Sequence, residues 1–302
     1  MTLENGAGHR SGFAAIVGRP NVGKSTLVNA LLGRKISIVT PKPQTTRHRI
    51  LGILTRPDLQ LVLIDTPGIH GDQRRVMNRY MNRAALGSLA DADVLVFVVE
   101  ALRFGPADER VLAEITRHAR PIVLVVNKVD RVKSKERLLP FIEALRQRAD
   151  FAAIVPLSAL KRDNLAELPE LIARHLPQSP PLFPAEQVTD RGPEFQAAEI
   201  IREKLTWRLR QELPYGLAVE IERFAHDEDG RLLINAIIWV ERTGQKAIVI
   251  GHGGEGLQKV GRAARLELSR LFAAPVHLEL WVKVKQNWSD SEAALRQFGY
   301  ES

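Results

Sequence analysis

Short, almost continuously apolar runs alternate with helical patterns over the first 178 residues of the chain. Such runs are typical of buried parallel strands, which are covered on both faces. The tight turn at 54–59 joins the second run to the third, which predicts an antiparallel hairpin. Strands are expected at 13–17, 49–55, 60–65, 93–100, 121–126 and 152–156. The pattern predicts an α/β domain with a six-stranded mixed sheet, helices on both faces, and the order β-α-β-β-α-β-α-β-α-β-α.

A proline-rich stretch follows, with five prolines between residues 176 and 194. Proline cannot sustain a helix interior or a central strand, so this stretch is interpreted as a linker. Beyond it we expect a helix at 195–213, strands at 217–224 and 232–240, a turn at 242–245, an apolar run at 246–250, a helix at 257–272, a strand at 276–284 and a helix at 291–298. The predicted organisation is a flexible tail (1–10), a first domain (11–178), the linker (179–193) and a second domain (194–302).

The first strand leads into a glycine-containing segment with the spacing of a phosphate-binding loop, and a helical pattern follows it and stops at Gly33. Glycines let backbone N–H groups wrap around a phosphate, and the helix N-terminus adds partial positive charge. Lys24 can reach the outer phosphates, and the Ser25 hydroxyl can ligate Mg²⁺. The loop comprises Gly18, Arg19, Pro20, Asn21, Val22, Gly23, Lys24 and Ser25.

A second motif, Asp65-Thr66-Pro67-Gly68, closes the apolar run at 61–64. A carboxylate at a strand end can hold Mg²⁺ through water, and the Gly68 N–H can contact the terminal phosphate.

A third motif follows the apolar run at 122–126 and predicts guanine recognition. The Asp130 carboxylate can accept hydrogen bonds from both guanine N1–H and the exocyclic amino group. Adenine lacks the N1 proton and would leave this acid unpaired. Asn127 can bond the N7 side of the base, and the Lys128 stem can cover the ring. The motif comprises Asn127, Lys128, Val129 and Asp130.

After the last predicted strand of the first domain, Ser158-Ala159-Leu160 can offer backbone N–H groups to guanine O6. These four motifs, in this order, resemble a Ras-like GTP-binding domain. In the second domain, a Gly-x-x-Gly loop within the order α-β-β-α-α-β resembles a type II KH domain, whose loop lets single-stranded nucleic acid approach closely. The candidate RNA-binding residues are Gly251, His252, Gly253 and Gly254.

A GTPase domain, a proline-rich linker and one C-terminal KH domain together resemble the Era family of bacterial GTPases over residues 11–298. Further family-like stretches lie at 43–49, 183–191, 212–215 and 274–285. The resemblance implies slow, Mg²⁺-dependent hydrolysis of GTP to GDP and phosphate. It also implies binding to the 3′ region of small-subunit rRNA, a role in 30S ribosomal subunit assembly, and peripheral membrane association, for which the sequence shows no feature. A monomer is expected.

The resemblance also assigns individual roles. Mg²⁺ is expected on Ser25, Thr46 and water-bridged Asp65, although the sequence does not separate Thr46 from its neighbour Thr45. Asn21 is implied to help bind K⁺ between the phosphates; the alternative is that it only stabilises the loop turn. The expected catalytic residues are Lys24, Asn21, Thr46 and Gly68.

Two positions depart from the related families. Ile69 joins the predicted nucleotide contacts but stands where many GTPases have the glutamine that orients the attacking water. In the RNA loop, Gly253 replaces a lysine that Era proteins commonly carry, and Glu255 adds a negative charge. Weaker attraction to phosphates is therefore expected.

Composition agrees with a cytoplasmic protein that has an anionic partner. The chain has no cysteine and a formal net charge of +8, and it has no run of 18 apolar residues. Residues 1–184 carry 27 basic and 17 acidic side chains, whereas residues 185–302 carry 16 and 18. Basic clusters, interpreted either as solvated helix faces or as phosphate-facing surface, lie at Arg47 and Arg49 and at Arg74, Arg75, Arg79 and Arg83.

Two other functions are alternatives to an active GTPase switch. An RNA-binding assembly scaffold with a non-hydrolysing nucleotide site would be separated from an active switch by measuring GTP binding. An RNA-modification GTPase would need a further catalytic domain, and residues 185–302 offer no nucleophile pair, metal cluster or cofactor loop.

Overall fold

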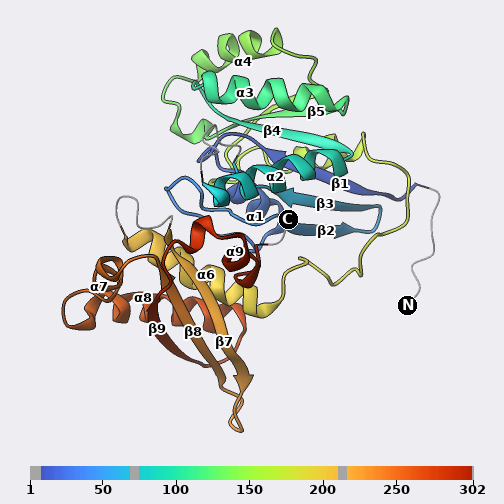
Figure 1. Cartoon of the computed structure of the whole chain (residues 1–302). Coiled ribbons are helices and arrows are strands. Elements are labelled where there is room, and N and C mark those ends of the chain that lie inside the picture. Colours follow the sequence, from blue (N-terminus) through green and yellow to red (C-terminus); the bar gives the residue numbers. More distant parts are fainter. Residues whose placement is uncertain (1–7, 69–74, 210–215, 301–302) are drawn as a thin grey trace. The chain divides into compact units, whose positions relative to one another are not determined.

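The computed structural model describes residues 8–68, 75–209 and 216–300. The chain divides into two compact units, of which the first contains most of residues 8–190 and the second contains 191–300 with two short segments from 40–45 and 75–80. Figure 1 labels most of the elements of both units, and each unit is described by itself below.

The first unit is built on a six-stranded sheet with the order β2-β3-β1-β4-β5-β6. The strands are β1 Arg10–Val17, β2 Ile50–Arg56, β3 Leu59–Asp65, β4 Val94–Glu100, β5 Ile122–Asn127 and β6 Ala153–Pro156. Only β2 is antiparallel, and it pairs with β3 across the predicted hairpin. Strand β1 begins three residues before the predicted start because Arg10 already pairs with Leu59 of β3. The mixed sheet and the predicted element order are confirmed.

Helices cover this sheet, and its apolar strands form the core. The helices are α1 Lys24–Leu32, α2 Val76–Asp91, α3 Pro106–Ile115, α4 Leu138–Arg146 and α5 Glu167–Ala173. Helix α1 packs on β1, β2 and β3, and α5 packs on β1 and β3. All seven residues of β3 and of β4 are buried, which explains why both strands are almost entirely apolar before their last, acidic residue, with Gln60 of β3 as the exception.

The second unit has the order α6-β7-β8-α7-α8-β9-α9, which confirms the expected KH-like succession. Its elements are α6 Pro193–Arg208, β7 Ala218–His226, β8 Leu232–Val240, α7 Thr243–Ile250, α8 Glu255–Leu271, β9 Val276–Val284 and α9 Glu292–Gln297. The sheet order is β7-β8-β9, with β8 antiparallel to β7 and parallel to β9. Helix α6 begins at Pro193, where a missing N–H costs nothing.

The predicted turn at 242–245 is wrong, because those residues cap and begin α7. The Gln245 side chain accepts hydrogen bonds from the backbone N–H groups of Glu241 and Arg242, at 2.8 and 3.0 Å. This side-chain cap lets the helix start at Thr243 and continue through the apolar run. The predicted helix at 195–213 ends at Arg208, and 210–215 lie outside the described residues.

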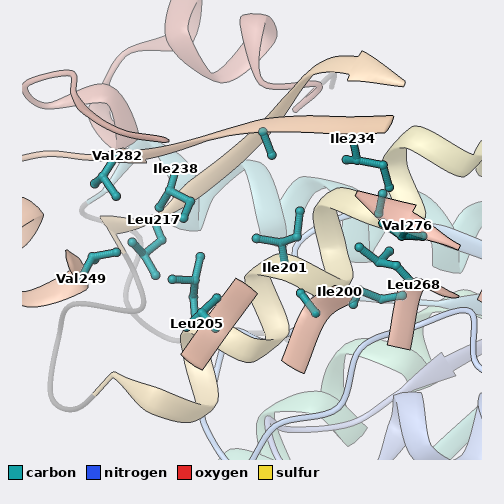
Figure 2. Close-up of a cluster of buried hydrophobic side chains, with 14 of the residues drawn as sticks. Ile200, Ile201, Leu205, Leu217, Ile234, Ile238, Val249, Leu268, Val276 and Val282 are labelled. Atoms are coloured by element: carbon teal, nitrogen blue, oxygen red, sulfur yellow. The ribbon is translucent and has the colours of Figure 1, made fainter. Parts of the chain in front are cut away.

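A separate hydrophobic core holds the second unit together. Helix α6 contributes Ile200, Ile201 and Leu205, and β8 contributes Ile234 and Ile238. Figure 2 shows these side chains packed with residues from α7, α8 and β9. Because this core is distinct from that of the first unit, the Gly-rich loop between α7 and α8 is supported by its own layer of packed elements.

Candidate functional site

The four predicted motifs follow β1, β3, β5 and β6, which are parallel to one another within the sheet. Their carboxyl ends therefore lie along the same edge, where ligands bind in open α/β sheets. Three of the inner strands, β1, β4 and β5, follow one another in the sheet, so the loop after β1 and the motif after β5 are separated only by β4.

The phosphate-binding loop adopts a conformation that only glycine allows at two positions. A Cβ on Gly18 would stand 2.4 Å from the Val98 carbonyl oxygen, and one on Gly23 would stand 2.4 Å from Asn127 Nδ2. Gly23 has φ of 103° and caps the start of α1. Asn21, at the tip, also has positive φ, at 64°. The loop is thus drawn tightly against the sheet, as backbone N–H groups facing a phosphate require.

Lys24 lies buried beneath this loop. Its Nζ donates to the carbonyl oxygens of Gly18 and Arg19, at 2.9 and 3.1 Å. Burial lowers the pKa of Lys24 to about 8, and the nearby Asp65 carboxylate partly offsets this shift. A cation held under the loop is placed to meet the outer phosphates of a nucleotide.

This lowered pKa predicts a pH dependence of nucleotide binding. A bound phosphate favours the charged lysine and raises its pKa, so binding takes up a proton once free Lys24 is neutral. Affinity for GDP should be constant well below pH 8 and fall as the pH rises through 8, by about fourfold between roughly pH 7 and 8.5. Calorimetric titration in buffers of different ionisation enthalpy measures both the affinity and the proton uptake. Affinity that does not change over this range would contradict the assignment.

Two hydroxyls and one carboxylate form a candidate Mg²⁺ site. The Oγ atoms of Ser25 and Thr46 are 2.8 Å apart. Asp65 is fully buried, and its carboxylate oxygens make no hydrogen bond of ordinary geometry with any described residue. Burial raises the pKa of Asp65, which the hydroxyls of Ser37 and Ser25 and the charge of Lys24 oppose. A buried carboxylate without a hydrogen-bond donor fits a hard cation bound there directly or through water.

The structure also distinguishes the two neighbouring threonines. Thr45 Oγ1 is 2.6 Å from Thr40 Oγ1 and donates to the Lys42 carbonyl oxygen at 2.7 Å. Thr46, in contrast, faces Ser25. Of the two alternatives left open by the sequence, the geometry favours Thr46.

The Asp65–Gly68 motif lies against the phosphate-binding loop. The Thr66 hydroxyl donates to the Ile16 carbonyl oxygen at 2.8 Å. A Cβ added to Gly68 would come within 3.0 Å of the Pro20 nitrogen. Pro67 lies between these two anchored residues, and Ile69 lies outside the described residues. The Gly68 backbone is therefore close to the loop that would hold the phosphates.

Asn127 ties three of the motifs together. Its Nδ2 donates to the Val22 carbonyl oxygen at 2.9 Å, and its Oδ1 accepts from the N–H groups of Lys128 and Ala159, at 2.7 and 3.0 Å. An amide nitrogen carries two protons, so one donor remains for the base. Asn127 thus links the phosphate-binding loop to the predicted base-binding loops.

Asp130 and Ser158 meet at the base-recognition end. The Ser158 hydroxyl donates to Asp130 Oδ1 at 2.6 Å, which leaves Oδ2 and further lone pairs for guanine. The Ser158 and Ala159 N–H groups bond Asp163 O and Asn127 Oδ1, whereas no bond from the Leu160 N–H to a described residue is seen. The O6 donor therefore stays a prediction.

An acidic cluster that sequence reasoning missed supports the loop. Lys128 Nζ donates to Glu100 Oε2 and to the Asn21 carbonyl oxygen, both at 2.7 Å. Arg19 lies 3.6 Å from Glu100 and 3.1 Å from Asp108. The signal available in the sequence was Glu100 itself, the one charged residue of the seven-residue strand β4, which lies between β1 and β5 in the sheet.

The basic cluster of Arg47 and Arg49 does not form the exposed surface that the sequence suggested. Arg47 is 2% exposed, so it belongs neither to a solvated face nor to a phosphate-facing surface. Arg49 pairs with Asp91 at 2.7 Å. Arg75, Arg79 and Arg83 are exposed at or near the start of α2, and Arg74 lies outside the described residues.

The Gly-rich loop of the second unit forms a short 3₁₀ turn between α7 and α8. Gly251, Gly253 and Gly254 all have positive φ, at 75°, 55° and 84°. A Cβ on Gly251 would meet the Gly256 nitrogen at 2.9 Å, whereas Gly253 and Gly254 face open space. His252 is exposed, and Glu255 is paired with Lys259 at 2.8 Å. The loop therefore presents bare backbone at the start of α8.

The fold and these two sites define a Ras-like P-loop GTPase domain followed by a KH domain. Residues 13–128 match the family model of a 50S ribosome-binding GTPase, and residues 212–289 match that of a KH domain. GTPase Era of Stenotrophomonas maltophilia is 54% identical over 294 residues, which cover 97% of this chain and 98% of that protein. GTPase Era of Xanthomonas oryzae pv. oryzae is 55% identical with the same coverage.

Solved structures of Era proteins lead to the same family. A crystal structure of Era in complex with MgGDPNP and nucleotides 1506–1542 of 16S ribosomal RNA is 40% identical, with a TM-score of 0.94, over 97% of this chain and all of that one. A variant of Aquifex aeolicus Era bound to GDP·AlF₄⁻ matches equally well. The chain belongs to the Era family of GTPases, whose nucleotide is GTP or GDP with Mg²⁺.

Proposed function

We propose that this GTPase binds GTP–Mg²⁺ in the first unit, hydrolyses it, and binds the 3′ region of small-subunit rRNA through the second unit during 30S subunit assembly. The observation that carries the nucleotide part is the cluster of Ser25, Thr46 and unpartnered Asp65 beside buried Lys24. A non-hydrolysing scaffold would have no need to keep these groups together. The loss of GTP hydrolysis on chelation of Mg²⁺ is the first expected result.

Each residue has a distinct part in hydrolysis. Bound Mg²⁺ neutralises charge on the outer phosphates. Ser25 and Thr46 would supply hydroxyl oxygens to the ion, and Asp65 would supply a carboxylate that acts through water. Lys24 and the Gly68 N–H would face the terminal phosphate of a bound nucleotide, where negative charge must be stabilised as the bond breaks. Asp130 and the 158–160 loop hold guanine, which fixes the orientation of the phosphates.

Asn21 is proposed to ligate a potassium ion beside the phosphates. Its backbone carbonyl oxygen is held by Lys128, and its positive φ fixes the loop tip. This anchoring holds Asn21 at the tip of the loop that would carry the phosphates.

Turnover is expected to be several times faster in potassium than in sodium at matched ionic strength. The reason is that a positive charge near the phosphates stabilises the transition state. Asn21→Ala should remove this preference while GDP binding persists. Equal rates in the two salts for the unmodified protein would exclude the cation role and leave Asn21 as a residue that shapes the turn.

RNA binding is proposed for residues 251–254 because the loop exposes backbone at a helix start, where KH domains clamp nucleotides. A relative of this chain has been crystallised with rRNA nucleotides 1506–1542. The test is a titration of the full chain with an RNA of that sequence and with a scrambled RNA of equal length. Tighter binding of the former supports the proposal, and equal binding rejects it.

Within the described residues no helix is long and apolar enough to cross a membrane. We propose a cytoplasmic monomer with boundaries at about 11–178, 179–193 and 194–302, and with peripheral membrane contact at most. Sedimentation velocity tests the monomer, and flotation with anionic vesicles tests the membrane contact.

A further inference from the structure

The charged residues of α8, the helix that begins after the Gly-rich loop, are unevenly partnered. The helix has two acidic residues, and each is paired with a lysine. Glu255 accepts from Lys259 at 2.8 Å, one turn along the same helix. Glu267 pairs with Lys204 of α6. Both acidic residues of α8 therefore have a basic partner, although Lys204 is shared between Glu267 and Glu203 of α6.

Three arginines of α8 remain without a partner. Arg262, Arg265 and Arg270 are exposed, and in the part of the chain that the structure describes they make no hydrogen bond or ion pair. Elsewhere in this unit, Arg202 is bound by Glu199 at 2.7 Å and Arg296 lies near Glu292. The unpartnered charge of α8 is therefore purely positive.

The helix geometry places these arginines on one side. Val260, Ala264 and Leu268 are buried in the core of the unit, so the opposite half of α8 faces solvent. At 100° per residue all three arginines fall in that half, and 1.5 Å of rise per residue spreads them over about 12 Å. We call Arg262, Arg265 and Arg270 the arginine face. It begins at Arg262, about two helical turns along α8 from the Gly-rich loop.

We propose that the arginine face is a second RNA contact, which binds backbone phosphates of the strand beyond the nucleotides held at the Gly-rich loop. This inference rests on the RNA binding proposed above. Guanidinium groups match phosphate oxygens as bidentate donors and keep their charge at any physiological pH. The contact would supply the positive charge that Gly253 and Glu255 do not.

RNA fits this face better than an anionic membrane does. A helix that lies on a membrane needs an apolar side to insert among the lipids. The apolar side of α8 is largely buried in the protein, and its exposed large apolar residues are Leu266, at 49%, and Leu271, at 38%. Bare backbone suited to nucleic acid begins the same helix.

The number of contacts sets the expected salt dependence. Each phosphate contact with a single strand contributes a slope of about −0.7 in log affinity against log salt. Three arginines contribute about −2, which is shallow compared with strongly basic RNA binders. The near balance of charge in residues 185–302 is thus compatible with a local electrostatic contact.

The test compares two full-chain variants with equal loss of charge. R262Q/R265Q/R270Q removes the arginine face. R223Q/R231Q/R296Q removes three exposed arginines from other elements of the same unit. Each is titrated with a single-stranded RNA of about twelve nucleotides from the proposed rRNA region, and with a four-nucleotide RNA, the length that a KH loop clamps. Thermal unfolding confirms that both variants fold.

The arginine-face variant should bind the longer RNA roughly 10–100-fold more weakly at about 0.1 M salt, with a salt slope reduced by about 2. Its affinity for the four-nucleotide RNA should be unchanged, and the control variant should match the unmodified protein. Equal losses of RNA affinity in the two variants would overturn the inference. So would an arginine-face variant that binds RNA normally but no longer binds phosphatidylglycerol vesicles. An unmodified protein that binds neither RNA would overturn the proposed RNA function together with this inference.

Discussion

Replacing Asp130 by alanine is expected to abolish the preference of this GTPase for GTP over ATP. The carboxylate is fixed by the Ser158 hydroxyl at 2.6 Å, so it is preorganised to accept the two guanine donors. Losing a paired, charged contact of this kind costs about 2–5 kcal/mol, or roughly 30-fold to several thousandfold in affinity. Competition titrations with GTP and ATP measure the change directly.

Two further variants sharpen this prediction. Asp130→Asn replaces an acceptor by a donor, which suits xanthine, since xanthine has a carbonyl oxygen in place of the exocyclic amino group. This variant should therefore gain affinity for xanthosine triphosphate as it loses GTP. Asp150→Ala, which removes an exposed carboxylate of the same unit, should change neither the affinity for GTP nor the affinity for xanthosine triphosphate. An unmodified protein that binds ATP as tightly as GTP would refute the assignment of the base site.

Gly253→Asp is expected to weaken RNA binding by about 10–100-fold. Gly253 has φ of 55°, and a Cβ there would meet nothing within 4 Å, so the new side chain would project into open space before α8. That space is where an RNA backbone would approach, and a carboxylate there adds bulk and repels phosphate. Fluorescence anisotropy with the proposed rRNA sequence measures the loss.

Gly230→Asp provides the matched control. Gly230 also has positive φ, at 75°, and open space around its Cβ, but it lies in the turn between β7 and β8. The two variants therefore carry the same added charge and a similar backbone strain. If Gly230→Asp weakens RNA binding as much as Gly253→Asp does, the effect is one of net charge or stability, and the loop is not the binding site.

The sequence by itself determined the strands and the order of the motifs. Strands β8 and β9 begin and end at the predicted residues, because the mostly apolar run of β8 and the apolar–polar alternation of β9 each mark the length of a strand. The sequence also predicts the position of the phosphate-binding loop, because Gly18, Gly23 and Lys24 serve chemistry that acts within eight consecutive residues. Local rules are sufficient where the interacting groups are close in sequence.

Only the tertiary structure decided which distant side chains meet. Adjacent threonines are equivalent in sequence, yet Thr46 faces Ser25 while Thr45 is bound to Thr40. The sequence suggests that Arg47 is a surface cation, but its side chain is buried. Glu100 reaches Lys128 because the sheet places β4 between β1 and β5. Each of these outcomes depends on how separate segments of the chain pack. Contacts between side chains far apart in the sequence are fixed by burial and by the order of strands in the sheet rather than by local propensity.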